Sequence, residues 1–325
     1  MKVGIGALHD VQATVDRCSQ LGVGQVYIAC ASLPGYQENG YPDPASLREF
    51  KGRLEENGLE VPSACYWFAK WPPRPWRNGS TNPDILLSRD RRCINAMLRM
   101  IEILGKVGIT SVLHYLDLGK PIDNSQEEAC SPSAQQFASQ TAWEGLIDIY
   151  RELIPVAESY GVGIGNHSLH RCLPDGLREQ AVTAEIQLED FGSYMTDGWG
   201  GPFLVGKPEE LRRLVNAVPS PCNGVTLCTG MDIVGGDVPA LIEEFAGKSH
   251  FCQIRDHDAR WPAAQEVFLG EGRLDFPCIF TALRDAGYNG IVNPEHLGKP
   301  RCPGEDLQAK GVAYVKSQLA ALEIV

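Results

Sequence analysis

Asn223-Gly-Val-Thr-Leu-Cys-Thr-Gly-Met231 is predicted to be a short apolar strand that ends at Cys228 and is followed by a glycine turn. Two later stretches share this layout, Phe251-Cys-Gln-Ile-Arg-Asp-His-Asp258 and Gly290-Ile-Val-Asn-Pro-Glu-His296. In each, an apolar strand runs directly into polar side chains that can bind a metal. This repetition indicates a parallel barrel whose separate strand ends supply side chains to one ion.

Short runs rich in Val and Ile alternate along the chain with longer segments of helical spacing, which is the pattern of consecutive βα units. Several predicted strands follow a glycine that is expected to end the preceding helix. These glycines are Gly58, Gly108, Gly161 and Gly287. Eight strands are predicted, at Val3–Gly6, Gln25–Ala29, Leu59–Ala64, Ser111–His114, Gly163–Asn166, Gly224–Leu227, Phe251–Ile254 and Gly290–Asn293.

Eight βα units with nearly continuous apolar strands predict an α/β fold, a single (β/α)8 TIM barrel that forms one domain over residues 1–325. A doubly wound open sheet is the alternative, but Gly4-Ile-Gly-Ala-Leu-His9 lacks the third glycine of its usual phosphate turn. The long connections 116–135 and 168–206 follow strands four and five. In a barrel both lie on the active face and are candidate lids.

Composition excludes several classes of partner. The net charge of −12 argues against nucleic acid and anionic membranes, although it says nothing about one local cleft. No apolar run approaches about 18 residues and the N-terminal residues lack a signal-peptide core, so we expect a soluble cytoplasmic protein. The 11 cysteines show no framework spacing and are expected to be reduced thiols. A homo-oligomer is compatible with the sequence, which leaves the oligomeric state open.

Four candidate metal ligands follow four successive predicted strands: His167, Cys228, Gln253 and Glu295. Imidazole, thiolate, amide oxygen and carboxylate all bind divalent ions. Each residue alone also has a structural explanation, for example a buried small apolar side chain for Cys228. Glu295 is the strongest candidate, because a carboxylate at the end of an apolar strand is costly unless it is paired or coordinated. Their joint placement favours a metal site.

Acid, base and substrate-binding candidates come from strand ends and from predicted active-face loops. The cluster Arg255-Asp-His-Asp-Ala-Arg260 can supply both an acid–base pair and an anion clamp, or it can be a solvated loop of salt bridges. The candidates for proton transfer are Asp256 and His257 as base, and His170 and His296 as acid. The substrate-binding candidates are Arg255, Arg260, His114, Trp67 and Arg171.

At these residues the chain resembles bacterial mannonate dehydratases. The resemblance is strongest over residues 208–230, 237–255, 287–290 and 294–296, and a weaker match covers residues 95–118. It implies a xylose-isomerase-like barrel that binds a divalent ion, often Mn2+. His167 and Cys228 match the family's ligands, Glu295 stands where the family has aspartate, and Gln253 stands where it has histidine.

The resemblance implies a metal-dependent lyase, a dehydratase that acts on a sugar acid or related carbohydrate by proton abstraction and β-elimination. The small-molecule substrate is expected to differ from that of the family, because Ser168–Pro174 departs from its pattern and an insertion follows to Gly200. The resemblance makes Mn2+ the expected ion, with Fe2+, Co2+ and Zn2+ as alternatives. A thiolate ligand favours any of these four over Mg2+, because thiolate is a soft donor. A metal-dependent sugar isomerase or epimerase is the second hypothesis, since Gly270–Asp275 is similar to a segment of related epimerases. A metal-free barrel that binds a sugar or a partner protein is the third.

Overall fold

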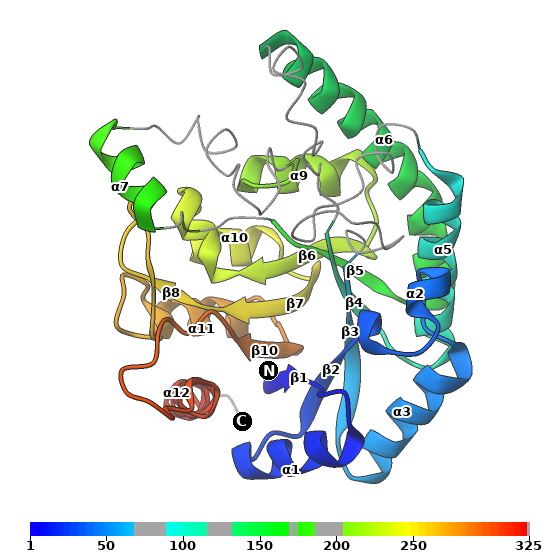
Figure 1. The fold of residues 1–325 in the computed structure, drawn as a ribbon, viewed down its shortest axis with the longest axis horizontal. Coiled ribbons are helices and arrows are strands. Elements are labelled where there is room, and N and C mark those ends of the chain that lie inside the picture. Colours follow the sequence, from blue (N-terminus) through cyan, green and yellow to red (C-terminus); the bar gives the residue numbers. More distant parts are fainter. Residues whose placement is uncertain (68–88, 116–131, 169–171, 173–174, 186–203, 324–325) are drawn as a thin grey trace.

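Eight parallel strands close into a barrel in the computed structural model, which describes residues 1–67, 89–115, 132–168, 172, 175–185 and 204–323 (Figure 1). The order around the barrel is β1-β10-β7-β6-β5-β4-β3-β2. The strands are β1 (Lys2–Gly6), β2 (Gln25–Ala29), β3 (Glu60–Trp67), β4 (Ser111–Tyr115), β5 (Gly163–Asn166), β6 (Asn223–Cys228), β7 (Ser249–Ile254) and β10 (Ile291–Pro294). All eight strands predicted from the sequence are confirmed, with shifts of one to three residues at some ends.

Helices surround the barrel, as the (β/α)8 prediction requires (Figure 1). They are α1 (Val11–Leu21), α2 (Tyr36–Asn39), α3 (Pro44–Glu56), α5 (Arg91–Lys106), α6 (Pro132–Tyr160), α7 (Asp175–Thr183), α9 (Pro208–Ala217), α10 (Val238–Glu244), α11 (Phe276–Asp285) and α12 (Leu307–Ala321). The short 3-10 helices η1 (Cys30–Ser32) and η6 (Thr229–Val234) follow β2 and β6. In the described part of the chain, no helix is both long and apolar enough to cross a membrane.

Helix ends follow simple chemical signals in this chain. An aspartate side chain accepts a backbone N–H at the start of six helices, and each such cap stabilises its helix by about 1 kcal/mol. These caps are Asp10, Asp43, Asp90, Asp237, Asp275 and Asp306. The four glycines predicted to end helices all have φ between 64° and 80°, a left-handed region that glycine enters without strain.

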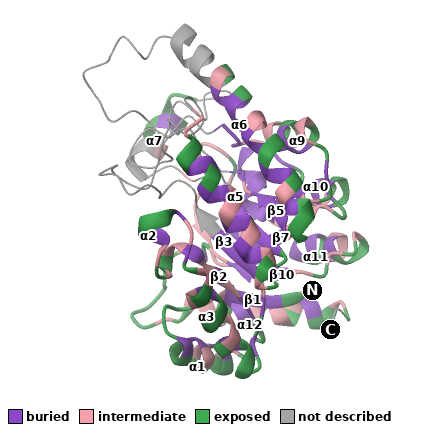
Figure 2. Ribbon diagram, turned by 90° about the vertical axis from the view of Figure 1, so that its right-hand side faces the viewer, coloured by how far each residue is buried: buried purple, intermediate pink, exposed green. Residues whose placement is uncertain are grey.

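Two apolar clusters can be followed among the residues that the structure describes. The larger lies between the strands and the helices, and Figure 2 shows its buried residues on the strands and on the helix faces that meet them. The smaller consists of Cys65, Leu113, Phe251 and Ile291 with Tyr27 packed against them. Its members come from five different strands, so it fills the inside of the barrel and supports the strand ends above it.

Two features lie beyond the simple barrel pattern. A two-stranded antiparallel sheet, β8 (Asp256–His257) and β9 (Glu266–Val267), follows β7 directly. The predicted long connections are described only in part. Residues 132–135 of the first belong to α6 rather than to a loop, and the second contains α7, while most of the remaining positions of both lie outside the described residues.

Candidate metal centre

The four predicted ligands come from four neighbouring strands of the barrel, β5, β6, β7 and β10. Cys228 is the last residue of β6 and pairs in register with Gln253 of β7. His167 directly follows β5, and its backbone N–H donates to His114 O over 2.9 Å. Glu295 directly follows β10, and its backbone N–H donates to Ile254 O over 2.9 Å. These backbone bonds continue the strand ladders by one residue and fix both side chains at the barrel mouth.

Strand alternation turns these side chains toward the inside of the barrel. Phe251 and Ile291 belong to the inner apolar cluster. Alternate residues of a strand face the same side, so Gln253 and Glu295 also face inward. Leu227 packs in the outer core, which places its neighbour Cys228 on the inner side. The same alternation that fills the barrel therefore gathers the polar side chains at its end.

Three of the four candidate ligands are close enough to share one ion. One ligand atom each from His167, Cys228 and Glu295 lies within 4.8 Å of the other two. Cys228 Sγ donates to Glu295 Oε1 over 3.7 Å, and Gln253 Nε2 donates to Glu295 Oε2 over 2.6 Å. Gln253 also lies beside His167, and its buried Oε1 makes no hydrogen bond within the described part of the chain. Because a buried acceptor without a partner is costly, this oxygen suits a fourth donor to a cation.

The electrostatics of the donor set also suit a cation. Burial is the main reason why the pKa of His167 is lowered to about 3, and the neighbouring charge of Arg255 lowers it further. His167 is therefore neutral and able to bind a metal. Burial raises the pKa of Cys228 to about 12, and it also raises the pKa of Glu295. The charge of Arg255 opposes both of these shifts. Burial thus penalises both anionic ligands, and a divalent ion would stabilise them. The residues fit a metal.

Arg255 lies next to this centre and carries a buried positive charge, with 3% of its side chain exposed. Burial alone would lower its pKa, but the charges of Cys228, Glu295 and Glu266 raise it, so the guanidinium stays protonated. Its Nη1 donates to Glu266 Oε1 over 3.1 Å. Arg255 therefore neutralises anionic groups around the centre, a function consistent with its prediction as part of an anion clamp.

His296 lies at the edge of the centre, directly after Glu295. Its Nδ1 is 2.8 Å from Glu266 Oε1, and 47% of its side chain is exposed. Its backbone has a φ of 48°, which is uncommon for a residue other than glycine and turns the chain sharply after the strand. His296 thus combines an anchored ring with access to solvent, as a proton-transfer residue requires.

Asp256 is fully buried and engaged by backbone groups. Its carboxylate accepts N–H groups from His257 over 2.8 Å, Gly270 over 3.0 Å and Gly272 over 2.9 Å. A Cβ at position 272 would lie 2.3 Å from Asp256 Oδ1, so only glycine fits there. Asp256 therefore orders the loop after β9, and this geometry favours a structural role over the base role predicted for it.

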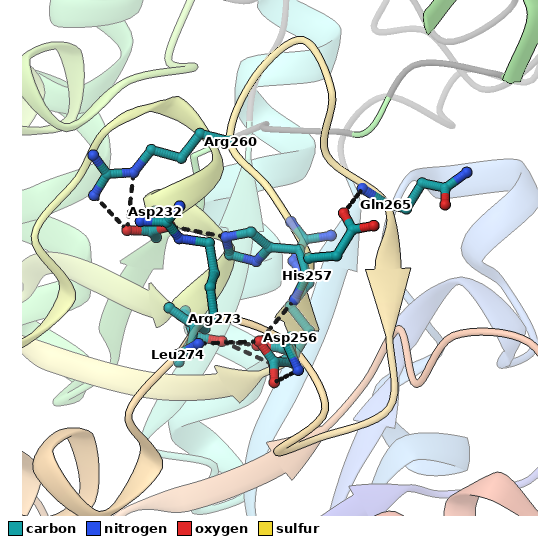
Figure 3. Close-up of polar contacts among 11 residues, drawn as sticks. Asp232, Asp256, His257, Arg260, Gln265, Arg273 and Leu274 are labelled. Atoms are coloured by element: carbon teal, nitrogen blue, oxygen red, sulfur yellow. Dashed lines mark hydrogen bonds and ion pairs between the residues drawn. The ribbon is translucent and has the colours of Figure 1, made fainter.

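His257 and Arg260 meet at Asp232, which was not among the site residues predicted from the sequence (Figure 3). Asp232 Oδ2 is 2.9 Å from His257 Nε2 and 2.8 Å from Arg273 Nε, and Oδ1 is 2.7 Å from Arg260 Nη2. Burial alone would raise the pKa of the Asp232 carboxylate. The hydrogen bonds from His257 and Arg260 have a larger, opposite effect, so the pKa of Asp232 is lowered. His257 has no exposed surface, so the geometry favours a structural role for it as well.

The remaining predicted site residues lie apart from this centre or outside the described residues. His114 packs between the barrel and the helices, among Met97, Met100 and Leu153, with its ring 6.3 Å from that of Tyr150. Burial lowers its pKa to about 4. This placement gives no support to a substrate contact. His170 and Arg171 lie outside the described residues, and of Trp67 only the backbone, in β3, is described.

Sequence reasoning missed Glu266 and Asp232, two polar residues at this end of the barrel. Asp232 lies four residues after Cys228, and a carboxylate within the apolar run Gly230–Val234 was a signal that it has partners. Glu266 follows no predicted strand, since β9 has only two residues. No sequence pattern marked it.

Comparison with known proteins agrees with this architecture. The family model described as "Xylose isomerase-like TIM barrel" matches residues 15–318. A mannonate dehydratase from Brachyspira hyodysenteriae (strain ATCC 49526 / WA1) is 32% identical over 136 residues, which cover 38% of this chain and 38% of that relative. The chain thus matches well under two thirds of that relative's length.

Solved structures are similar over almost the whole chain. The mannonate dehydratase from Streptococcus suis serotype2 has a TM-score of 0.69 at 19% identity, and the match covers 99% of this chain and 96% of that one. The D-psicose 3-epimerase from Clostridium cellulolyticum H10, solved with D-tagatose, has a TM-score of 0.65 at 18% identity, with 99% of both chains covered. At these identities the similarity shows the fold.

Proposed function

The chain belongs to the xylose isomerase-like TIM barrel family, and from that premise we propose that it is a divalent-metal-dependent lyase. The proposed reaction is dehydration of a sugar acid or a related carbohydrate by proton abstraction and β-elimination. The observation that carries the proposal is the set of ligand atoms of His167, Cys228 and Glu295, each within 4.8 Å of the others at the barrel mouth.

In this proposal His167, Cys228 and Glu295 hold the ion, and Gln253 Oε1 supplies a further donor. The ion, for which the resemblance to mannonate dehydratases suggests Mn2+, would polarise a substrate carboxylate or hydroxyl and so increase the acidity of the adjacent C–H. Gln253 also keeps Glu295 in place through its amide N–H. Arg255 balances the negative charge of the ligands and of an acidic substrate.

Among the described candidates, His296 is best placed to move a proton. Glu266 holds the ring at Nδ1, which leaves Nε2 to reach the substrate. We assign His296 both proton transfers: its Nε2 accepts the proton from the C–H and then donates it to the departing hydroxyl, which leaves as water. Asp256 and His257 are buried and engaged by loop and side-chain partners, which argues against the base role for either.

The relatives support a sugar acid as the substrate class, since mannonate is one and the Brachyspira hyodysenteriae relative is named for it. Gln253 and Glu295 differ in residue type from the ligands that the resemblance implies. We therefore propose a substrate related to mannonate but distinct from it.

The same centre would also serve a sugar isomerase or epimerase, in which the abstracted proton returns to a neighbouring carbon. The loop Gly270–Asp275, which Asp256 orders, favours this second candidate through its similarity to related epimerases. Product analysis separates the two. Only the lyase converts a sugar acid to a 2-keto-3-deoxy product, which periodate and thiobarbiturate detect.

The test begins with metal content. Purified protein is loaded with Mn2+ and dialysed, and bound metal is measured by elemental analysis beside the double variant Cys228→Ala, Glu295→Ala. We expect about one ion per wild-type chain and little in the variant. Panels of hexonates are then assayed with the loaded protein. Absence of stoichiometric metal in the wild type would contradict the proposal and favour a metal-free binding barrel.

A further inference from the structure

A groove of about 140 Å³ lies on the far side of Glu266 from His296 and Arg255, and Glu266 is one of its lining residues. One wall comes from β9 and the loop that follows it, with Glu266, Phe268 and Glu271. The other comes from the segment between β10 and α12 and from the first turns of α12, with Arg301 and Lys310. In Figure 1 this orange-red segment passes beside the β8–β9 region on its way to α12.

Glu266 connects the groove to the centre. It lines the groove, and the same Oε1 contacts His296 Nδ1 over 2.8 Å and Arg255 Nη1 over 3.1 Å. His296 directly follows the candidate ligand Glu295, and Arg255 interacts electrostatically with Cys228 and Glu295. One side chain, Glu266, therefore separates His296 and Arg255 from the groove.

The charges of the groove are balanced. Three acidic and three basic side chains line it. The acidic residues are Glu266, Glu271 and Glu305, and the basic residues are Lys299, Arg301 and Lys310. Arg301 pairs with Glu271, and Lys310 pairs with Glu305. An ion would gain little net attraction here, whereas hydroxyl groups, which both donate and accept hydrogen bonds, can use both members of each pair.

The groove also has an apolar part, formed by Val267, Phe268 and Leu307. A ligand with hydroxyls at its edge and C–H groups on its face matches this combination, and a sugar ring is such a ligand. Barrels often bind phosphate near this position, between the last two loops and a helix N-terminus. Here Asp306 already caps α12 by accepting Ala309 N–H over 3.0 Å, and Glu305 adds negative charge, so phosphate is disfavoured.

We propose that this groove is a second subsite that binds an uncharged sugar ring linked to the sugar acid, so that the substrate is a glycoside of a sugar acid. The inference rests on the proposed function for the position of the sugar acid itself. It adds that the protein selects a two-ring substrate. The volume, far below that of sites for drug-sized ligands, suits one ring rather than a longer chain.

The test compares ligands that share one acid. Calorimetry with Mn2+-loaded protein measures binding of D-gluconate and of three glucose- or galactose-linked gluconates: cellobionate, maltobionate and lactobionate. At least one of the three is expected to bind about tenfold more tightly than D-gluconate, a gain of about 1.4 kcal/mol. The variant Glu271→Ala, Arg301→Ala removes an exposed pair without changing net charge, and it should lose this gain while keeping the affinity for D-gluconate.

The matched control is the double variant Arg91→Ala, Glu152→Ala. It removes another exposed ion pair, between α5 and α6, in which 57% of the Arg91 side chain and 42% of the Glu152 side chain are exposed. It should keep the gain. Three outcomes would each overturn the inference. The wild type could bind one-ring and two-ring acids with equal affinity, or the groove variant could keep the gain in affinity for the two-ring acid. The third is inorganic phosphate that binds to the wild type but not to the groove variant. Failure of the proposed function is seen separately, as absence of bound Mn2+ before any sugar is added.

Discussion

Gln253 Nε2 donates a hydrogen bond to Glu295 Oε2 over 2.6 Å, between the ends of two neighbouring strands. The bond orients a carboxylate whose other oxygen faces Cys228 Sγ. Groups that orient metal ligands typically contribute 10- to 100-fold to affinity. Replacement of Gln253 by Leu removes this donor and the candidate oxygen ligand. We therefore expect Gln253→Leu to weaken Mn2+ binding about 100-fold in a calorimetric titration.

The chain contains a matched control for this change. Gln25 Nε2 donates to Glu60 Oε2 over 2.6 Å, at the starts of β2 and β3 and so at the opposite end of the barrel. Gln25→Leu should leave Mn2+ affinity at the wild-type value. Similar losses in the two variants would mean that the Gln253 effect is a general loss of stability.

The cysteines of adjacent strands offer a second paired prediction. Cys228 faces the candidate centre, whereas Cys252 is buried in the outer core. Cys228→Ala removes a direct ligand and is expected to lower Mn2+ affinity by about 100-fold or more and to abolish activity. Cys252→Ala should cost about 1 kcal/mol of unfolding free energy and leave Mn2+ binding unchanged. Normal Mn2+ binding by Cys228→Ala would exclude the thiolate as a ligand.

The barrel could be predicted from the sequence because its signals are local. Each strand is a short apolar run, and glycines such as Gly58 and Gly108 end the helices before them. The candidate ligands could be located for the same reason, since each lies at the end of such a run. Strand alternation would also have placed His114 correctly, because Leu113 faces inward and its neighbour must face the helices.

The partners of these residues could not be predicted in this way. Asp256 and His257 follow a strand, and that position alone predicts an acid–base role for them. Their engagement depends on Asp232 and on the loop at Gly272, which are distant in sequence. Sequence position shows where a side chain begins, but only the fold shows whether its polar atoms are already engaged. Glu266 was missed for the same reason.

Asp232 is expected to stabilise the fold in a pH-dependent way. It joins His257, Arg260 and Arg273, and 9% of its side chain is exposed. Asp232→Asn removes the central charge and should lower the unfolding free energy at pH 7 by about 2–3 kcal/mol. The exposed Asp285→Asn, whose carboxylate has 63% exposure, is the control and should change it by less than about 0.5 kcal/mol.

The sign of the pH effect follows from the lowered pKa of Asp232 in the folded protein. Its contribution is complete above the unfolded pKa of about 3.9 and is lost as the pH falls below it toward the folded pKa. The difference in urea stability between wild type and Asp232→Asn should therefore be constant from pH 7 to pH 5 and shrink at pH 3. A difference that grows on acidification would contradict the ionised state of Asp232.

Gly272 provides a test of the loop that Asp256 orders. A methyl group at this position would lie 2.3 Å from Asp256 Oδ1 and 2.4 Å from His257 O, both of which are buried. Gly272→Ala must displace the loop or the carboxylate, and we expect it to lower the unfolding free energy by about 2 kcal/mol. Gly52 lies within α3, where an added methyl group would meet no described atom within 4 Å, so Gly52→Ala should raise stability by about 1 kcal/mol. Urea denaturation measures both changes, and a Gly272→Ala variant as stable as the wild type or more stable would show that the contact with Asp256 is not what requires glycine at position 272.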